Sequence, residues 1–262
     1  YYIYNVPAGN YTINVYKADL NGTSSSVTVS TNQETPNVQI SASSGAGGAV
    51  SGKVSFLSTS NKEVDISLVD IFTGEAIPGL STTTQSSNYL FSKVPNGIFL
   101  ARATFKNDGL SMDPDWIIKN GLPLVTITGN AVTKDFSVTG AVSLVSPTNV
   151  SSTTIPVTVS GIAPLLSWVD YSSANDYVVE VINSNGKTIW GGFAGSGATM
   201  TKSVSTTNTS IAFNSDGSAT EALQKGKVYR WKVYASKDDN KSATGWKLIS
   251  VSEDQMGLFV VE

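Results

Sequence analysis

The sequence predicts an all-β protein whose β-sandwich domains follow one another in a linear array. Three observations support this fold class. The 262 residues include 23 glycines and are rich in serine and threonine, a composition typical of short strands joined by turns. Apolar and polar residues alternate in several segments, as half-buried strands require. Helical periodicity is weak throughout, and we expect only one short helical turn, at residues 219–224.

The chain contains an internal repeat. Residues 2–11 align with residues 89–99 when one residue is inserted, and Val6 and Val94 lie 88 positions apart (94 − 6 = 88). Each copy has a strand with alternating aromatic residues, a Val-Pro-x-Gly turn and a second strand that opens on an aromatic residue. We therefore predict the same β-hairpin in both copies.

Further strands are predicted upstream of the second copy only. They cover residues 50–56 and 64–71, and a turn and the polar residues 81–88 follow them. With an 88-residue repeat, the first copy lacks the strands that should cover its apolar face. Two interpretations remain open: the natural chain continues upstream of Tyr1, which we favour, or another molecule supplies the strands.

Two segments have the composition of joints between domains. Residues 42–48 are small and glycine-rich, and residues 146–154 are rich in serine, threonine and proline. Between the joints, alternation predicts strands at residues 99–105 and 124–128. We therefore divide the chain into domains 1–45, 46–145 and 146–262.

The middle domain resembles the carboxypeptidase regulatory-like family of transthyretin-type β-sandwiches. The resemblance lies in the Ser-Gly-Lys-Val opening at residues 51–54, the strand at 65–70 and the Val-Pro-x-Gly motif within 89–99. Residues 1–45 look like the tail of another such module. The resemblance implies a non-catalytic accessory or spacer of an exported protein. The excursion at residues 107–120 is longer than the family pattern.

The last domain is similar to a fibronectin type III domain. Trp168 matches the tryptophan of the second strand, and residues 177–181 match the third strand. The spacing of Leu223, Gly226 and Tyr229 matches the family's tyrosine corner, in which the phenol tethers the chain to backbone. No Arg-Gly-Asp sequence is present, so integrin-type adhesion has no support.

Composition excludes several function classes. The chain has no cysteine and no histidine, so thiolate chemistry, histidine-based triads and histidine-ligated metals are excluded. The 17 lysines and arginines against 20 acids argue against nucleic-acid binding, which needs a dense basic face. The acids are scattered along the chain rather than paired in one segment. We therefore predict no enzyme activity, no cofactor, no metal and no membrane span.

Three aromatic residues are candidate glycan-binding residues. Trp190 and Phe193 lie among glycines, which offer no side chain to cover a ring, and Trp116 lies in a polar segment. Exposed rings of this kind stack on sugars. The alternative, which we favour, is that each ring plugs the open end of its sandwich.

Two acidic clusters are candidate calcium sites, because calcium prefers carboxylate and carbonyl oxygens. One contains Asp108, Asp113 and Asp115, and the other contains Asn214 and Asp216. Asp and Asn are also ordinary turn residues, and we favour that interpretation.

The sequence predicts a non-catalytic protein with a structural or adhesive role, located outside the cell or at its surface. The expected assembly is a surface filament or multidomain fibre that is completed by strand complementation. Its expected partners are copies of itself, neighbouring surface proteins or a polysaccharide. The alternative is a glycan-binding accessory module of an exported protein.

The expected assembly edge comprises Tyr2, Tyr4 and Tyr11, because unpaired strands recruit partner strands. Leu258 and Val260 lie in the candidate donor strand. For that segment we favour the alternative that it is the last strand of its own domain.

Overall fold

The computed structural model describes residues 3, 6–45, 47–57, 59, 63–85, 87–104, 109–149, 155–253 and 255–262. Strands account for 52% of the structure and helices for 4%, which confirms the all-β fold class. Contacts divide the chain into two compact units. The first comprises Tyr1–Lys53, Asp65–Arg102 and Pro123–Asp135, and the second comprises Val54–Val64, Ala103–Leu122 and Phe136–Glu262.

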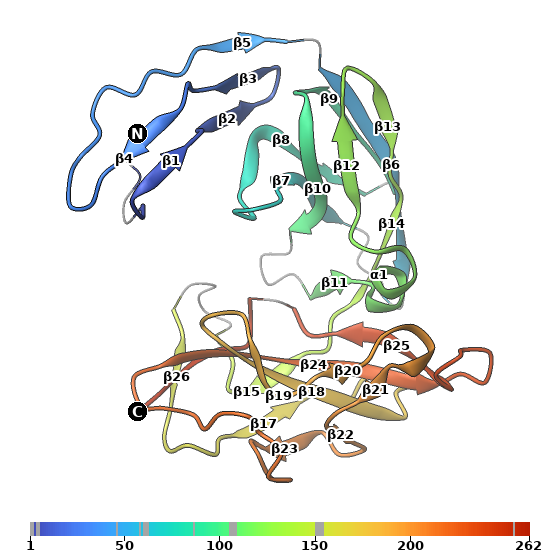
Figure 1. Cartoon of the computed structure of the whole chain (residues 1–262). Coiled ribbons are helices and arrows are strands. Elements are labelled where there is room, and N and C mark those ends of the chain that lie inside the picture. The colour runs from blue at the N-terminus through green and yellow to red at the C-terminus, as the bar shows by residue number, and fades with distance from the viewer. Residues whose placement is uncertain are drawn as a thin grey trace. The chain divides into compact units, whose positions relative to one another are not determined.

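The N-terminal part of the first unit consists of five short strands, drawn in blue in Figure 1. They are β1 (Gly9–Tyr11), β2 (Asn14–Lys17), β3 (Leu20–Thr23), β4 (Val27–Val29) and β5 (Ala42–Ser44). β1 pairs antiparallel with β4, whereas β2, β3 and β5 form a second sheet. Among the described residues up to Gly45, only Ser24 and Val27 are buried. This part has almost no core of its own.

The rest of the first unit contains a substantial core. Its elements are β6 (Gly48–Leu57), β7 (Val64–Asp70), β8 (Ala76–Thr84), β9 (Asn88–Val94), β10 (Gly97–Thr104), β12 (Leu124–Ile127) and β13 (Ala131–Thr133). The first half of β6 pairs with β9 and β13, while β12, β10, β7 and β8 form another sheet in that order. Alternate residues of these strands point inward, and Val50, Ile66, Leu68 and Phe99 are fully buried.

The Val-Pro-x-Gly motif of the second copy is not a hairpin turn, so that prediction was wrong. β9 pairs with β6, whereas β10 pairs with β12 in the other sheet. Residues 94–97 therefore carry the chain from one sheet to the other. The glycine and proline pattern predicts that the chain reverses, but which strand each arm joins depends on partners distant in sequence.

The two parts of the first unit are hydrogen-bonded to each other. At the β2–β3 turn, the backbone N–H of Ala18 donates to the carbonyl of Pro78 over 2.9 Å, and that of Asp19 donates to Lys93 over 2.7 Å. The ring of Tyr16 meets the edge of Phe99 with centroids 5.5 Å apart. The β2–β3 turn is therefore anchored on strands β8 and β9.

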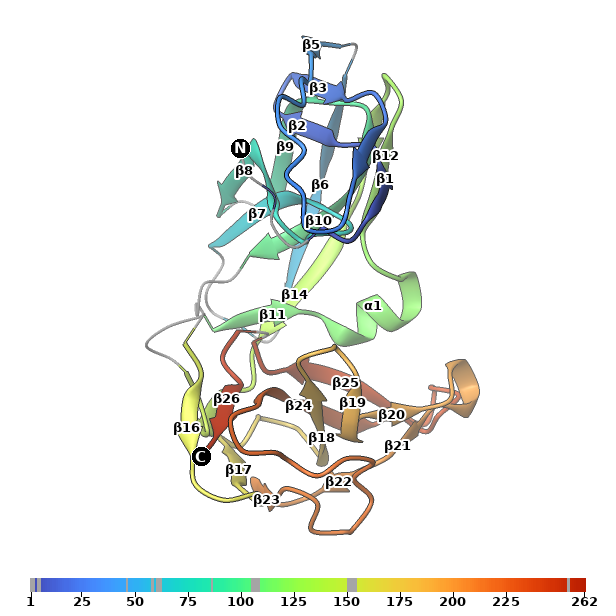
Figure 2. The ribbon, with the colours of Figure 1, turned by 60° about the vertical axis from the view of Figure 1, so that its left-hand side comes forward.

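In the second unit, the C-terminal half of β6 pairs in parallel with β14 (Phe136–Gly140), and β14 pairs with β11 (Leu110–Met112). Helix α1 (Pro114–Asn120) follows and packs against β25 (Trp246–Val251), as Figure 2 shows. Asp113 caps the helix by accepting from the N–H of Asp115 over 3.0 Å. The sequence analysis missed this helix, although an Asp-Pro pair is a known start signal.

The C-terminal part of the second unit is a sandwich of two sheets. One contains β15 (Leu144–Ser146), β17 (Leu165–Trp168) and β23 (Ser210–Ala212). The other contains β16 (Val157–Val159), β26 (Leu258–Val261), β24 (Val228–Asp238), β18 (Asp176–Asn183) and β19 (Thr188–Gly191), with β22 (Ser205–Thr206) on β18 and β25 on β24. Figures 1 and 2 show β17 and β23 as a layer beneath β24.

A small hairpin projects from this sandwich. It is formed by β20 (Phe193–Ala194) and β21 (Thr201–Lys202), with the 3-10 turn η1 (Gly197–Thr199) between them. The helical turn expected at residues 219–224 does not form. Instead, the N–H of Thr220 donates to the carbonyl of Ile189 over 2.8 Å, which keeps this segment extended along β19.

The tyrosine corner forms as the Leu-Gly-Tyr spacing predicts. Tyr229 is buried, and its hydroxyl accepts a hydrogen bond from the backbone N–H of Gln224 over 3.0 Å. Gly226 has a φ of 75°, a left-handed conformation that glycine adopts without strain. Trp168 and Trp231 lie in the core, with ring centroids 6.3 Å apart.

The two segments predicted as joints have defined structure where they are described. Ala42–Ser44 forms β5 and pairs with β3. Ser146 ends β15, residues 147–149 follow it, and residues 150–154 lie outside the described residues. Upstream, the N–H of Val142 donates to Val251 over 3.1 Å, and the Ser250 hydroxyl donates to Gly140 over 2.6 Å. The domain boundaries at 45/46 and 145/146 stay a prediction.

Candidate functional site

Trp190 is not an exposed aromatic platform: the candidate glycan-binding role was wrong for this residue, and its ring is covered within the sandwich, in line with the alternative that we favoured. Its side chain is 2% exposed, and its Nε1 donates to the Asp216 carboxylate over 2.8 Å. The physical reason is the backbone at Gly191, where a Cβ atom would lie 1.8 Å from the carbonyl oxygen of Val179. The glycine lets β19 approach β18 closely, and Trp190, which is paired with Val181, packs in the core against Phe213 with ring centroids 5.3 Å apart.

Phe193 is half-buried and forms part of a cluster of three aromatic rings. It stacks on Trp246 with centroids 5.9 Å apart and meets Tyr234 edge-on at 5.1 Å. Lys202 lies over the Trp246 ring at 4.8 Å and pairs with Asp176 at 2.6 Å. These contacts fix the β20–β21 hairpin on β24 and β25. The sequence analysis did not connect Trp246 with Phe193, because 53 residues (246 − 193) separate them.

Trp116 lies half-buried on α1. In the described part of the chain it makes no ring contact with Phe193 or Trp190. The structure therefore does not combine the three candidate residues into one aromatic surface. Binding of a glycan at Phe193 or Trp116 stays a prediction.

The acidic clusters serve as caps and turns. Asp113 caps α1, and Asp115 pairs with Lys119 at 2.6 Å. Burial raises the pKa of Asp113. Asp216 accepts from Trp190 and from the Ser218 hydroxyl. Asp108 lies outside the described residues. Within those residues, no group of three or more Asp or Glu side chains could hold a metal ion.

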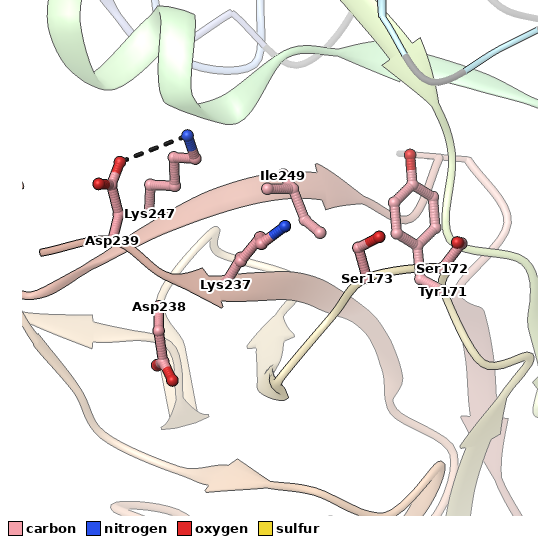
Figure 3. A pocket seen from close by; sticks show the side chains of 8 residues that line it. All are labelled: Tyr171, Ser172, Ser173, Lys237, Asp238, Asp239, Lys247 and Ile249. Carbon is pink, nitrogen blue, oxygen red and sulfur yellow. Dashed lines mark ion pairs between the residues drawn. The ribbon is translucent and has the colours of Figure 1, made fainter.

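One shallow pocket lies on the C-terminal sandwich, and Figure 3 shows its lining. It has a volume of about 640 Å³ and is lined by Tyr171, Ser172, Ser173, Lys237, Asp238, Asp239, Lys247 and Ile249. Asp239 accepts from the backbone N–H of Lys241 and pairs with Lys247 at 3.3 Å, and these contacts lower its pKa. In Figure 3 the Asp238 carboxylate points away from Asp239, so the two acids do not form a catalytic pair.

A neighbouring phenol is also unsuited to act as a base. Burial and a hydrogen bond to Asp170 raise the pKa of Tyr177 to about 12. Its hydroxyl donates to Asp170 over 2.7 Å and accepts from the N–H of Tyr171 over 2.6 Å. Tyr177 is therefore a neutral structural link beside the pocket rather than a proton acceptor.

The candidate donor strand at the C-terminus is already used within the chain. β26, which contains Leu258 and Val260, pairs in parallel with β16 and antiparallel with β24. Phe259 and Val261 alternate with them and are buried in the sandwich. The segment is the last strand of its own domain, as we favoured, and the assignment of Leu258 and Val260 to an assembly edge was wrong.

The N-terminal candidates differ in what the structure describes. Tyr2 and Tyr4 lie outside the described residues. Tyr11 is the last residue of β1, where it is half-buried and donates from its hydroxyl to the carbonyl of Pro7 over 2.9 Å. In the described part of the chain, β1 pairs with β4 alone. The other edge of β1 has no strand beside it among the residues that the structure describes.

The chain matches no family model and no curated protein. The matches to solved structures are distant. A DUF3823 family protein from Bacteroides uniformis shares 10% identity with a TM-score of 0.31, over 82% of this chain and 99% of that one. Fibronectin domains 1–3 of chicken CNTN1 share 12% sequence identity with this chain at a TM-score of 0.25, and the match covers 93% of this chain and 76% of that one. A streptococcal ancillary pilin shares 11% sequence identity at a TM-score of 0.25, and the match covers 98% of this chain and 72% of that one. None of these likenesses is close enough to assign a function.

Proposed function

We propose that this chain is a non-catalytic structural or adhesive protein of the cell surface, a subunit of a surface filament or multidomain fibre whose first module is completed by strand complementation. The main support is the contrast within the first unit. Residues 6–45 bury only two side chains, whereas the neighbouring sheets bury most of their inward-facing residues. An apolar strand edge that lacks a partner recruits one.

The modules themselves fit a spacing role. We assign residues 146–262 to a fibronectin type III-like sandwich, on the support of the tyrosine corner at Tyr229 and the buried Trp168. We assign residues 46–145 to a transthyretin-like sandwich, on the support of its two sheets. Modules of these kinds present or separate other domains in a surface filament or multidomain fibre.

Several features support a non-catalytic role. The chain has no histidine or cysteine, and the pocket of Figure 3 is lined by solvated side chains without a convergent acid–base pair.

No helix among the described residues is long and apolar enough to cross a membrane.

Protease shaving of intact producing cells tests the location, and sedimentation of the released protein under native conditions tests assembly. We expect peptides of this chain to be released before those of a cytoplasmic marker, and the native protein to sediment as a species larger than one chain. Release only after lysis, from a protein that sediments as a monomer at high concentration, contradicts the proposal.

A glycan-binding accessory role is the second candidate, because Phe193 remains half-exposed beside Trp246. Isothermal titration against a panel of polysaccharides tests it. If the role is correct, Phe193→Ala abolishes saturable binding. Phe72→Ala is the matched control, since Phe72 is 90% exposed in the β7–β8 turn, and this change leaves binding unaltered.

A further inference from the structure

Two lysines face each other across the β24–β25 strand pair. In the register of these antiparallel strands, Lys237 lies directly opposite Lys247, and like charges in this position destabilise a strand pair. The Asp239 carboxylate compensates one of them, because it pairs with Lys247 at 3.3 Å. Lys237 makes no ion pair with any residue that the structure describes. One positive charge on this face of the sheet is therefore left without an acidic partner.

This positive charge lies in the wall of the pocket of Figure 3. Lys237, Lys247 and Ile249 all line the pocket, whose volume is about 640 Å³, a size in the range of small-molecule sites. In Figure 3 the Lys237 ammonium group points toward Ile249 and Ser173, whereas the Lys247 ammonium group points toward Asp239. The pocket therefore combines one available cation with a small apolar surface.

The other wall of the pocket is a loop that hydrogen bonds hold in place. The backbone N–H of Tyr171 donates to the hydroxyl of Tyr177 over 2.6 Å, and the Tyr171 hydroxyl lies 3.0 Å from that of Thr139. Further along the loop, the N–H of Asn175 donates to the carbonyl of Ser236 over 2.8 Å. A ligand that binds here does not have to order the loop first, which lowers the entropic cost of binding.

Two serines lie between these anchors. Ser172 and Ser173 are exposed and line the pocket, and neither hydroxyl takes part in the hydrogen bonds that hold the loop. A serine hydroxyl can donate and accept. The fixed loop thus presents two neutral polar groups to the same pocket as the Lys237 ammonium group.

We propose that this pocket binds a uronate sugar of a polysaccharide, with Lys237 paired to the sugar's carboxylate. The hydroxyls of Ser172 and Ser173 exchange hydrogen bonds with the ring hydroxyls, and the Ile249 side chain contacts the C–H face of the ring. The inference rests on the proposed adhesive role and deepens it, because it names a ligand class and a site distinct from Phe193.

The lining of the pocket favours a sugar over an acidic peptide. A pyranose ring presents hydroxyls at its rim and C–H groups on its face, and the serines and Ile249 complement both. An extended peptide is recognised at a strand edge or in a groove, whereas the walls of this pocket are a sheet face and a loop. A single available lysine also matches a single carboxylate on each ring.

Isothermal titration of the whole chain with a galacturonic acid trisaccharide tests the inference. The methyl ester of the same trisaccharide is the matched neutral ligand, since it keeps the ring and removes the charge. We expect saturable binding of the acid, weaker binding of the acid at high salt, and a loss of at least about tenfold in affinity for the ester.

Paired variants locate the site. Lys237→Gln weakens binding of the acid at least about tenfold, and Lys237→Arg retains binding because it keeps the charge. Lys241→Gln is the matched control: Lys241 is exposed in the β24–β25 turn and does not line the pocket, so this change alters affinity by less than about twofold. Phe193→Ala also leaves binding of the acid unaltered. Far-UV circular dichroism establishes that all four variants are folded.

Four outcomes overturn the inference: no saturable binding of the acid, equal binding of the ester, equal losses in Lys237→Gln and Lys241→Gln, or loss of binding in Phe193→Ala. A hexa-aspartate peptide that binds as tightly as the trisaccharide and depends equally on Lys237 overturns the assignment to a sugar. Protease shaving reports the location of the chain without any ligand, so failure of the uronate site is distinguishable from failure of the surface role.

Discussion

Two tyrosines in this chain make the same kind of local tether but have different surroundings. Tyr229 accepts a hydrogen bond from the backbone five residues earlier, and Tyr11 donates one to the carbonyl four residues earlier. Tyr229 is 5% exposed and stacks on Phe259 of β26, with ring centroids 5.7 Å apart. Tyr11 is half-buried, on a strand that pairs with β4 alone among the described strands. A local tether therefore fixes a turn, whereas burial of the ring depends on strands that come from elsewhere in sequence.

The largest loss of stability is expected from removing the ring of Phe259, which stacks on the buried Tyr229. Phe259→Ala removes a side chain that is 0% exposed, and we expect a loss of about 3–5 kcal/mol in the free energy of unfolding. Urea denaturation of the whole chain measures it, and Phe193→Ala serves as a control with a smaller loss. Equal stability of Phe259→Ala and the parent chain would mean that β26 is not part of the sandwich core.

Hydrogen exchange compares the two copies of the Val-Pro-x-Gly motif directly. In the chain without a partner, we expect amides of β1 to exchange at least about a hundredfold faster than those of β10, because β10 has strands on both edges and a buried inner face. Exchange followed by mass spectrometry provides the rates. Similar protection in the two strands would show that β1 is already covered.

Removing a single hydroxyl sharpens the comparison of the two tyrosines. Tyr229→Phe leaves the partly buried N–H of Gln224 without its acceptor, and we expect a loss of about 1–3 kcal/mol. Tyr11→Phe removes an exposed hydrogen bond, and we expect a change of less than about 0.5 kcal/mol. Urea denaturation measures both values. A larger loss of stability for Tyr11→Phe than for Tyr229→Phe would contradict the expectation that the buried tether contributes more.

The smallest expected effect is a change in the free energy of unfolding at low pH. Burial raises the pKa of Asp216, but hydrogen bonds from Trp190 and Ser218 outweigh it and hold the pKa below its ordinary value of 3.8. Since the folded pKa is depressed, this contribution to stability is present above that value and is lost as pH falls through the folded pKa. Asp216→Asn should remove this part of the acid destabilisation, by less than about 1 kcal/mol because the carboxylate is exposed.

Urea midpoints for the two proteins at pH 6 and pH 2.5 provide the test. The parent chain should lose more stability between these pH values than Asp216→Asn does. A parallel decline in both proteins would assign the acid sensitivity to other carboxylates.

Aromatic residues show most clearly how far pattern alone could go. Alternation in β24 correctly places Tyr229, Trp231 and Val233 on the core face, because a strand directs every second side chain to one side. A different argument failed for Trp190, whose glycine neighbours suggested exposure although the ring is buried. Those glycines instead permit close contact with β18, a partner that the local sequence does not identify.

By itself, the sequence determined the all-β class, the period-two faces, the tyrosine corner and the repeat, since each depends on spacing within one short segment. Only the tertiary structure decided that β9 and β10 belong to different sheets, that β26 is paired on both sides, and that β1 pairs with β4 alone among the described strands. The physical reason is that a strand's conformation is local, whereas its hydrogen-bond partners and the burial of its inner face come from strands distant in sequence.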